Sequence, residues 1–311
     1  MRLPIILDCD PGHDDAVAIL LALASDELDV VGITTTFGNV DLAQTTRNAL
    51  VMTDLARRAV PVYPGADRPL LRARLSAEDV HGRSGLDGPT LDPPSRQPEP
   101  TRAAEFIART VLERPGEVTL VPVGPLTNIA LALRLEPRLA TAVRRIVLMG
   151  GGLNLGNTTP AAEFNILCDP HAAKIVFEAG IPLTMFGLNL THQALATPER
   201  VALIRALDTR IGRVTAELLD FFKLAYQKRY DFAGPALHDP TAVAYLVRPE
   251  LFTVQPMFVE VDATDGPSAG RTNCDRWNVT GRAPNADVAL TIDADGFFTL
   301  LTTRLEALGR R

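Results

Sequence analysis

Short apolar runs alternate along this chain with longer segments that are apolar on one face only. Short runs rich in Val, Ile and Leu are typical of buried strands, and segments with a period near 3.6 residues are typical of helices. The pattern predicts strands at Leu3–Leu7, Leu28–Thr35, Val118–Val123, Arg145–Met149, Pro182–Phe186, Thr253–Val261 and Val288–Ile292. It predicts helices at Ala16–Ala24, Leu42–Ala56, Arg102–Leu112, Leu126–Leu135, Pro170–Glu178 and Gly296–Leu308. The alternation indicates an α/β fold with an open, mainly parallel sheet flanked by helices.

Two segments depart from this alternation. Gly88–Pro100 is rich in proline and is expected to form an irregular surface loop. Residues 197–232 are more charged and predict a helical insertion, which ends close to the pair His238-Asp239. No internal repeat is visible, and we expect residues 1–311 to form a single domain.

The first loop crowds four carboxylates, Asp8, Asp10, Asp14 and Asp15, into the residues directly after an apolar run. Like charges this close raise one another's pKa and destabilise a fold unless a cation offsets them. Carboxylates without clustered Cys or paired His favour a hard cation, Ca²⁺ or Mg²⁺. A plainer alternative is an acidic turn that caps the next helix, since Asp14 and Asp15 would suit its first turn, but capping accounts for only one or two of the acids.

Composition and charge exclude some classes of partner. The net charge is −6 and no basic run occurs, so nucleic acid is not expected as a partner. No apolar stretch is long enough to span a membrane, and the chain starts in a strand-like segment without a signal-peptide pattern, which predicts a cytoplasmic protein. The three cysteines are odd in number and far apart, as expected of reduced thiols.

Six motifs follow one another along nearly the whole chain. They are Asp8–Ala16, Phe37–Val40, Gly124–Asn128, Met149–Gly152, Glu163–Asn165 and His238–Pro240. In order and separation they resemble the motifs of the inosine–uridine-preferring nucleoside hydrolases. The resemblance implies a Rossmann-like open sheet, a Ca²⁺ ion at its centre, and hydrolysis of the N-glycosidic bond of ribonucleosides to ribose and free base.

The resemblance also implies roles for individual residues. It gives Ca²⁺ the carboxylates of Asp10, Asp15 and Asp239 and the backbone carbonyl of Val123, and it makes Asp10 the general base for the attacking water. A negative site suits this reaction, because positive charge builds on the sugar as the base departs. The residues similar to the family's ribose-binding groups are Asp14, Asn39, Glu163 and Asn165, with Met149 and Asn157 near the 5′ end of the sugar.

Other residues are candidates for the base side. By similarity, His238 assists the departing base, although it would also suit a structural role beside Asp239. His81 resembles a histidine found near the base in pyrimidine-preferring members, but Arg83 stands where the family commonly has an acid. Tyr226 and Tyr230, four residues apart in a helical stretch, would share one face and either stack on the base or pack in the core.

The first expectation for the substrate is therefore uridine or cytidine, with a broader inosine–uridine range second. Similarity to the family suggests a homodimer or homotetramer. Two other function classes stay open. Asp8-x-Asp10 after a strand resembles a Mg²⁺-dependent haloacid-dehalogenase-type phosphohydrolase, but Gly12 stands where that family has Thr. A nucleoside-binding or sensing protein without activity would keep the same pocket.

Overall fold

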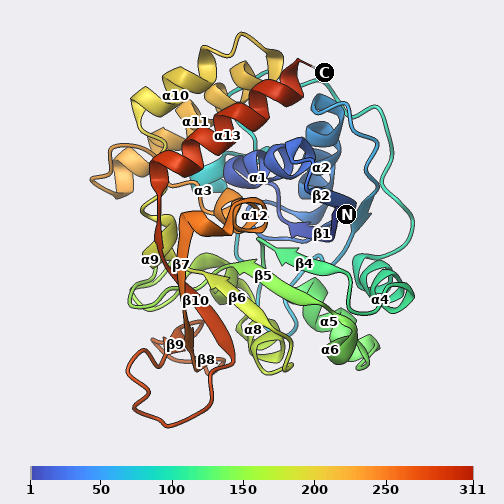
Figure 1. The fold of residues 1–311 in the computed structure, drawn as a ribbon, viewed down its shortest axis with the longest axis vertical. Helices are drawn as coiled ribbons and strands as arrows, with labels where there is room; N and C mark the ends of the chain where they lie inside the picture. The colour runs from blue at the N-terminus through green and yellow to red at the C-terminus, as the bar shows by residue number, and fades with distance from the viewer. Residues whose placement is uncertain (1, 311) are drawn as a thin grey trace.

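The computed structural model describes residues 2–310, apart from the side chain of Arg229. Its main sheet has the order β3-β2-β1-β4-β5-β6-β10-β7 (Figure 1). All neighbours in this sheet pair parallel except β10 and β7, which are antiparallel. The strands are β1 (Leu3–Cys9), β2 (Leu28–Thr35), β3 (Val62–Pro64), β4 (Thr119–Pro122), β5 (Arg145–Met149), β6 (Leu183–Phe186), β7 (Phe252–Met257) and β10 (Ala286–Ile292). The prediction of an open, mainly parallel α/β sheet is confirmed.

The order of the strands places a crevice at the centre of the sheet. From β1 the chain moves outward to β2 and β3, and it then crosses back to β4 on the other side of β1. In such sheets ligands bind beyond the carboxyl ends of the strands, at the point where the order reverses. In β1, Ile5 and Leu7 pack on one face of the sheet and Ile6 packs on the other. This two-sided burial explains the continuous apolar run at the start of the chain.

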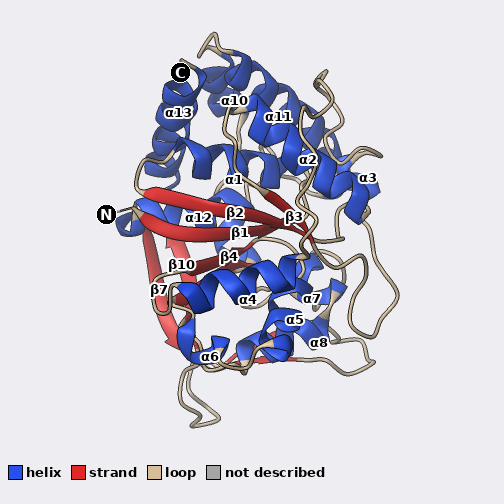
Figure 2. Cartoon of the chain, turned by 90° about the vertical axis from the view of Figure 1, so that its right-hand side faces the viewer, coloured by secondary structure: helices blue, strands red, loops and turns tan. Residues whose placement is uncertain are grey.

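Helices cover both faces of the sheet, as Figure 2 shows. On one face, α1 and α2 pack with α12 and α13, and α10 and α11 lie farther out. The opposite face carries α4, α5, α6 and α8. The longer helices are α1 (His13–Ala24), α2 (Leu42–Leu55), α4 (Ala103–Glu113), α5 (Thr127–Leu135), α8 (Pro170–Phe177), α10 (Pro198–Arg205), α11 (Arg210–Arg229), α12 (Asp239–Val247) and α13 (Ala294–Gly309). The short ones are α3 (Glu78–His81), α6 (Leu139–Ala142), α7 (Phe164–Cys168), α9 (Leu188–Thr191) and the 3₁₀ turn η1 (Pro249–Leu251).

The helices agree with the predicted pattern in most places. Helix α1 begins at His13, three residues before the predicted start, so the acidic turn runs directly into the helix. Helices α10 and α11 form the predicted helical insertion. Among the described helices, none combines the length and the apolar composition needed to cross a membrane.

The single strand predicted over Thr253–Val261 is wrong. The chain leaves the main sheet after Met257, and β8 (Val259–Val261) pairs instead with β9 (Thr272–Cys274) in a separate antiparallel hairpin. Asn285 stabilises the exit, because its side chain accepts a hydrogen bond from the Val259 N–H and donates one to the Val259 carbonyl. The apolar pattern is continuous across this point, so it does not reveal the change of partner.

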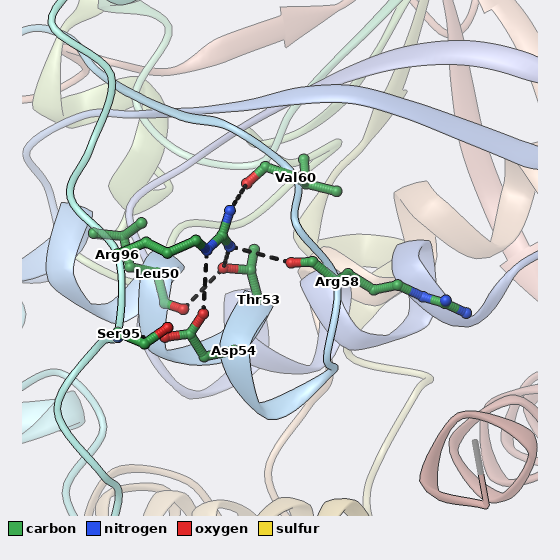
Figure 3. Close-up of polar contacts among 7 residues, drawn as sticks. All are labelled: Leu50, Thr53, Asp54, Arg58, Val60, Ser95 and Arg96. Carbon is green, nitrogen blue, oxygen red and sulfur yellow. Dashed lines mark hydrogen bonds and ion pairs between the residues drawn. The ribbon is translucent and has the colours of Figure 1, made fainter.

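The loop Gly88–Pro100 has no helix or strand, as predicted, but it is firmly attached. Arg96 donates to the Thr53 hydroxyl at 2.8 Å and to the Arg58 carbonyl at 3.1 Å, and it pairs with Asp54 (Figure 3). These acceptors lie in the last turn of α2 and just beyond its end. The arginine therefore ties the loop to the layer of helices above the sheet.

Candidate active site

A cavity of about 260 Å³ lies at the carboxyl ends of the central strands. Segments that follow β1, β2, β4 and β5 contribute to it, together with α3, α11 and the start of α12. The lining includes every residue predicted for the site except Asp15: Asp10, Asp14, Asn39, His81, Val123, Met149, Asn157, Glu163, Asn165, Tyr226, Tyr230, His238 and Asp239. Segments far apart in the sequence thus meet around one cavity, as the order of the strands requires.

Asp10 is held tightly at the end of β1. Its carboxylate accepts a hydrogen bond from the Asn39 backbone N–H at 2.8 Å. A Cβ at Gly124 would lie 2.3 Å from Asp10 Oδ1, and one at Gly38 would lie 2.0 Å from Oδ2. Both glycines belong to the sequence motifs described above, which assign neither of them a role. The structure shows that they leave room for the Asp10 carboxylate.

Asp15 does not line the cavity, and its carboxylate instead provides hydrogen-bond acceptors for the turn before α1. Its carboxylate accepts hydrogen bonds from the backbone N–H groups of Asp10 and Gly12 and from the Asn39 amide. The capping alternative is therefore correct for this one acid. Asp8 also lies outside the cavity, where one of its oxygens accepts from Thr34 and Asn128.

Three buried carboxylates come close enough to share a cation. Asp14, Asp15 and Asp239 each place one oxygen within 4.8 Å of the other two. The predicted ligand set contained Asp10 and the Val123 carbonyl rather than Asp14, and both of those also line the cavity. We refer to Asp10, Asp14, Asp15 and Asp239 as the acidic floor. Its donors are all hard oxygens, which fits a metal such as Ca²⁺ or Mg²⁺.

Burial dominates the electrostatics of the acidic floor. Burial, together with the neighbouring Asp15 carboxylate, raises the pKa of Asp14 to about 8, and burial raises that of Asp15 to about 6. The pKa values of Asp10 and Asp239 lie well above the ordinary range for the same two reasons. A bound cation would favour the ionised forms, because an opposite charge nearby offsets the cost of burial.

Glu163 and Asn165 line the cavity from the start of α7. Glu163 caps α7, and its carboxylate accepts hydrogen bonds from the backbone N–H groups of Gly151, Asn165 and Ile166. Burial raises its pKa to about 7, although these hydrogen bonds oppose the shift. The Asn165 amide donates to the Val123 carbonyl at 2.8 Å. The two side chains are therefore fixed by the backbone around them.

Asn157 and Met149 complete this side. The Asn157 side chain accepts a hydrogen bond from the Phe164 N–H at 2.9 Å, which ties its loop to the start of α7. Met149 is 3% exposed and belongs both to the hydrophobic core and to the cavity lining. It can therefore pack in the core and still contact a ligand in the cavity.

His238 and Tyr226 are hydrogen-bonded on the other wall. The Tyr226 hydroxyl lies 2.5 Å from His238 Nε2, and the Thr191 hydroxyl lies 2.7 Å from His238 Nδ1. Burial lowers the pKa of His238 to about 3 and holds the pKa of Tyr226 well above its ordinary value. His238 and Tyr226 are therefore neutral near pH 7. The hydroxyls of Tyr226 and Thr191 can each donate or accept a hydrogen bond.

His81 contacts His13 through one ring nitrogen. Its Nδ1 lies 3.1 Å from the backbone nitrogen of His13 and 3.0 Å from the His13 ring Nδ1, so the tautomer of His81 depends on that of His13. Burial holds its pKa well below the ordinary value. The rings of His81, His13 and Phe222 stack with centroids 5.1–5.4 Å apart. We refer to His81, Phe222, Tyr226, Tyr230 and His238 as the aromatic wall.

Several residues that contact the aromatic wall could not be identified from a sequence motif. Phe222 and Thr191 carry no motif, and only the spacing of Phe222 four residues before Tyr226 could have indicated it. His192 is another such neighbour. It is half-buried and packs against Phe232 and His238, with ring centroids 5.1 and 5.7 Å apart.

The chain matches the family model of inosine–uridine preferring nucleoside hydrolases over residues 5–299. A pyrimidine-specific ribonucleoside hydrolase RihA of Shewanella woodyi is 48% identical over 312 residues, which span 100% of both chains. The RihA of an Escherichia coli strain is 48% identical over 309 residues, which cover 98% of this chain and 99% of that one.

Solved structures of nucleoside hydrolases are similar to this chain over nearly its whole length. A purine-preferring ribonucleoside hydrolase from Gardnerella vaginalis superposes with a TM-score of 0.93 at 37% identity, over 99% of each chain. A plant nucleoside hydrolase superposes with a TM-score of 0.92 at 36% identity, over 98% of this chain and 99% of that one. Since both comparisons extend over the full cavity, this chain belongs to the inosine–uridine preferring nucleoside hydrolase family and is an enzyme that hydrolyses the N-glycosyl bond of ribonucleosides.

Proposed function

We propose that this enzyme prefers pyrimidine ribonucleosides, uridine and cytidine, and releases ribose and the free base with a water that Asp10 deprotonates. The observation that carries the proposal is the pairing, in one cavity, of an acidic floor with an aromatic wall that offers neutral hydrogen-bond donors. The names of the similar RihA enzymes, which are pyrimidine-specific, support the base preference.

The acidic floor suits the ribose half of the substrate. Asp10, Asp15, Asp239 and the Val123 carbonyl would hold Ca²⁺, and the nearness of Asp14 to Asp15 and Asp239 makes it a further candidate. When bound, the ion would orient water and ribose hydroxyls and make that water more acidic. Asp10 takes the proton of the water, and the remaining carboxylates stabilise positive charge on the sugar.

Asn39, Glu163 and Asn165 bind the ribose hydroxyls in this proposal, with Asp14 on the floor side. Met149 and Asn157 contact the 5′ end of the sugar. Their fixed hydrogen bonds to the backbone support the assignment, because a binding group that is already oriented loses little freedom when the substrate arrives.

The aromatic wall suits the base. In uracil and cytosine, a carbonyl oxygen is bonded to the carbon next to the nitrogen that leaves the sugar, and that oxygen gains charge as the bond breaks. His81, in the tautomer that carries its hydrogen on Nε2, is a donor for it. Both ring nitrogens of His238 are hydrogen-bonded, to Tyr226 and to Thr191, so His238 assists departure through the Tyr226 hydroxyl. The rings of Tyr226 and Tyr230 stack on the base.

Release of reducing sugar from uridine, cytidine, inosine and adenosine tests the proposal. We expect the highest kcat/KM for uridine or cytidine, loss of release after prolonged chelation, and recovery with Ca²⁺. A higher kcat/KM for inosine or adenosine would contradict the base preference. Recovery with Mg²⁺ but not Ca²⁺ would contradict the choice of metal.

In addition, we propose a cytoplasmic homodimer or homotetramer acting in nucleoside salvage, and sedimentation would test the oligomeric state.

A further inference from the structure

A buried hydroxyl connects the β8–β9 hairpin to the cavity. Thr272, in β9, is 2% exposed. Its Oγ1 accepts a hydrogen bond from the Gly152 N–H at 2.9 Å and donates one to the Gly152 carbonyl at 2.8 Å. A hydroxyl can donate and accept at once, so both main-chain groups of Gly152 are satisfied by this side chain. The hairpin is otherwise separate from the main sheet (Figure 1).

The segment that Thr272 holds is the one that orients Glu163. The Gly151 N–H donates to Glu163 Oε2 at 2.9 Å. Gly151 has a φ of +73°, and a Cβ there would lie 2.7 Å from Thr272 Cγ2. Thr272 therefore packs against Gly151 and bonds to Gly152, and both contacts restrain the N–H group that faces the carboxylate.

The same hairpin also supports α7, which carries the other partners of Glu163. Gly270, just before β9, has a φ of +78°, and a Cβ there would lie 2.8 Å from Leu167 Cα. Ala269 and Leu167 are buried together with Ala162. The hairpin thus contacts both segments whose backbone N–H groups hold Glu163, the loop after β5 and the first turn of α7.

We propose that Thr272 is a positioning residue that sets the Glu163 carboxylate for the substrate. The inference rests on the ribose-binding role proposed for Glu163. Without the hydroxyl, the buried N–H and carbonyl of Gly152 lose their partner, and the loop relaxes away from its present position. A small displacement of a substrate-positioning group lowers the rate even when the group itself is intact.

The test is kinetic and uses a double-mutant cycle on uridine hydrolysis. Thr272→Val keeps the shape and removes both hydrogen bonds, and we expect kcat/KM to fall about 10-fold. Thr272→Ser, which keeps the hydroxyl, should stay within about 2-fold of wild type. Thr280→Val is the matched control, because Thr280 is exposed in the segment after β9 and its hydroxyl bonds to Asp275.

Glu163→Gln distinguishes this inference from the proposed function. In that background, Thr272→Val should cost less than about 2-fold, because the carboxylate it positions is gone. The same 10-fold loss in both backgrounds would show that Thr272 acts on the fold, and would overturn the proposal. If Thr272→Val leaves kcat/KM unchanged while Glu163→Gln lowers it, the positioning role of Thr272 is overturned and the ribose-binding role of Glu163 stands. If Glu163→Gln also leaves kcat/KM unchanged, both roles are overturned. If the valine variant does not fold, Thr272→Ala supplies the same comparison, and wild-type kcat/KM in it would contradict the proposal.

Discussion

The acidic floor and the aromatic wall of the cavity are built from different kinds of structure. The floor comes mainly from the turn between β1 and α1, where Asp10 and Asp15 are held by backbone N–H groups and by close-packed glycines. The wall comes from α3, α11 and the start of α12, and its members contact one another through stacked rings and hydroxyl groups. The floor depends on the backbone of the sheet, and the wall depends on how helices pack outside it.

This difference suggests how one fold serves several substrates. Ribose and water are common to all ribonucleosides, so the groups that meet them can stay in a rigid frame. The base varies, and the side chains proposed to meet it lie in or next to helices α3, α11 and α12, outside the sheet. The names of the similar proteins fit this view, since one relative is pyrimidine-specific and a structure with a TM-score of 0.93 is purine-preferring.

The largest effect is expected on the floor. Asp10→Asn should lower kcat by at least about 10³-fold on every nucleoside, because the amide cannot take the proton of the water. Steady-state kinetics with uridine and inosine measure it. Asp29→Asn, at an exposed position in β2, is the control. Turnover near that of wild type in Asp10→Asn would remove Asp10 from the chemistry.

A smaller and selective effect is expected on the wall. His238→Ala should lower kcat for uridine by about 10²-fold, since assistance to the leaving group is lost. A 4-nitrophenyl riboside, whose leaving group needs no such help, should lose much less. Equal losses on the two substrates would argue that His238 supports Asp239 rather than the departing base.

The glycines around Asp10 offer a sterically defined perturbation of the floor. Gly124→Ala places a Cβ where the Asp10 carboxylate now lies, and we expect about a 10-fold loss of kcat as Asp10 shifts. Gly266→Ala, where the nearest heavy atom would be 4.0 Å away, should behave as wild type. An unchanged kcat in Gly124→Ala would mean that the position of Asp10 is not critical.

The smallest expected effect concerns stability. Because folding raises the pKa of Asp14 to about 8 and that of Asp15 to about 6, the folded state without metal binds protons more tightly than the unfolded chain. The contribution of these two carboxyls to stability should therefore fall as the pH rises from about 4 towards 8, whereas the depressed pKa of the buried His238 acts in the opposite direction. Thermal unfolding of chelated wild type and Asp14→Asn at pH 5 and pH 8 measures the carboxyl contribution as the difference between the two proteins. Added Ca²⁺ should raise the melting temperature more at pH 8, and an equal rise at both values would contradict the assignment.

Much of the sheet could be predicted from the sequence, because strands buried on both faces are continuous apolar runs. The acidic turn could also be predicted, because its carboxylates are close together in the sequence. The contact between Tyr226 and His238 was not, because it depends on how α11 packs against the start of α12. The stacking of His13 on His81 depends likewise on the path of a long loop.

The most direct test of the division between floor and wall is the ratio of kcat/KM for uridine to that for inosine in His81→Ala. The wall should set this ratio, and we expect it to fall about 10-fold, which corresponds to about 1.4 kcal/mol of lost discrimination. The substitution also removes the hydrogen-bond acceptor of the His13 N–H beside Asp14, so a loss shared by the two nucleosides is expected as well, and the ratio isolates the part that depends on the base. Equal losses on the two nucleosides, with the ratio unchanged, would contradict the assignment of base selection to the aromatic wall.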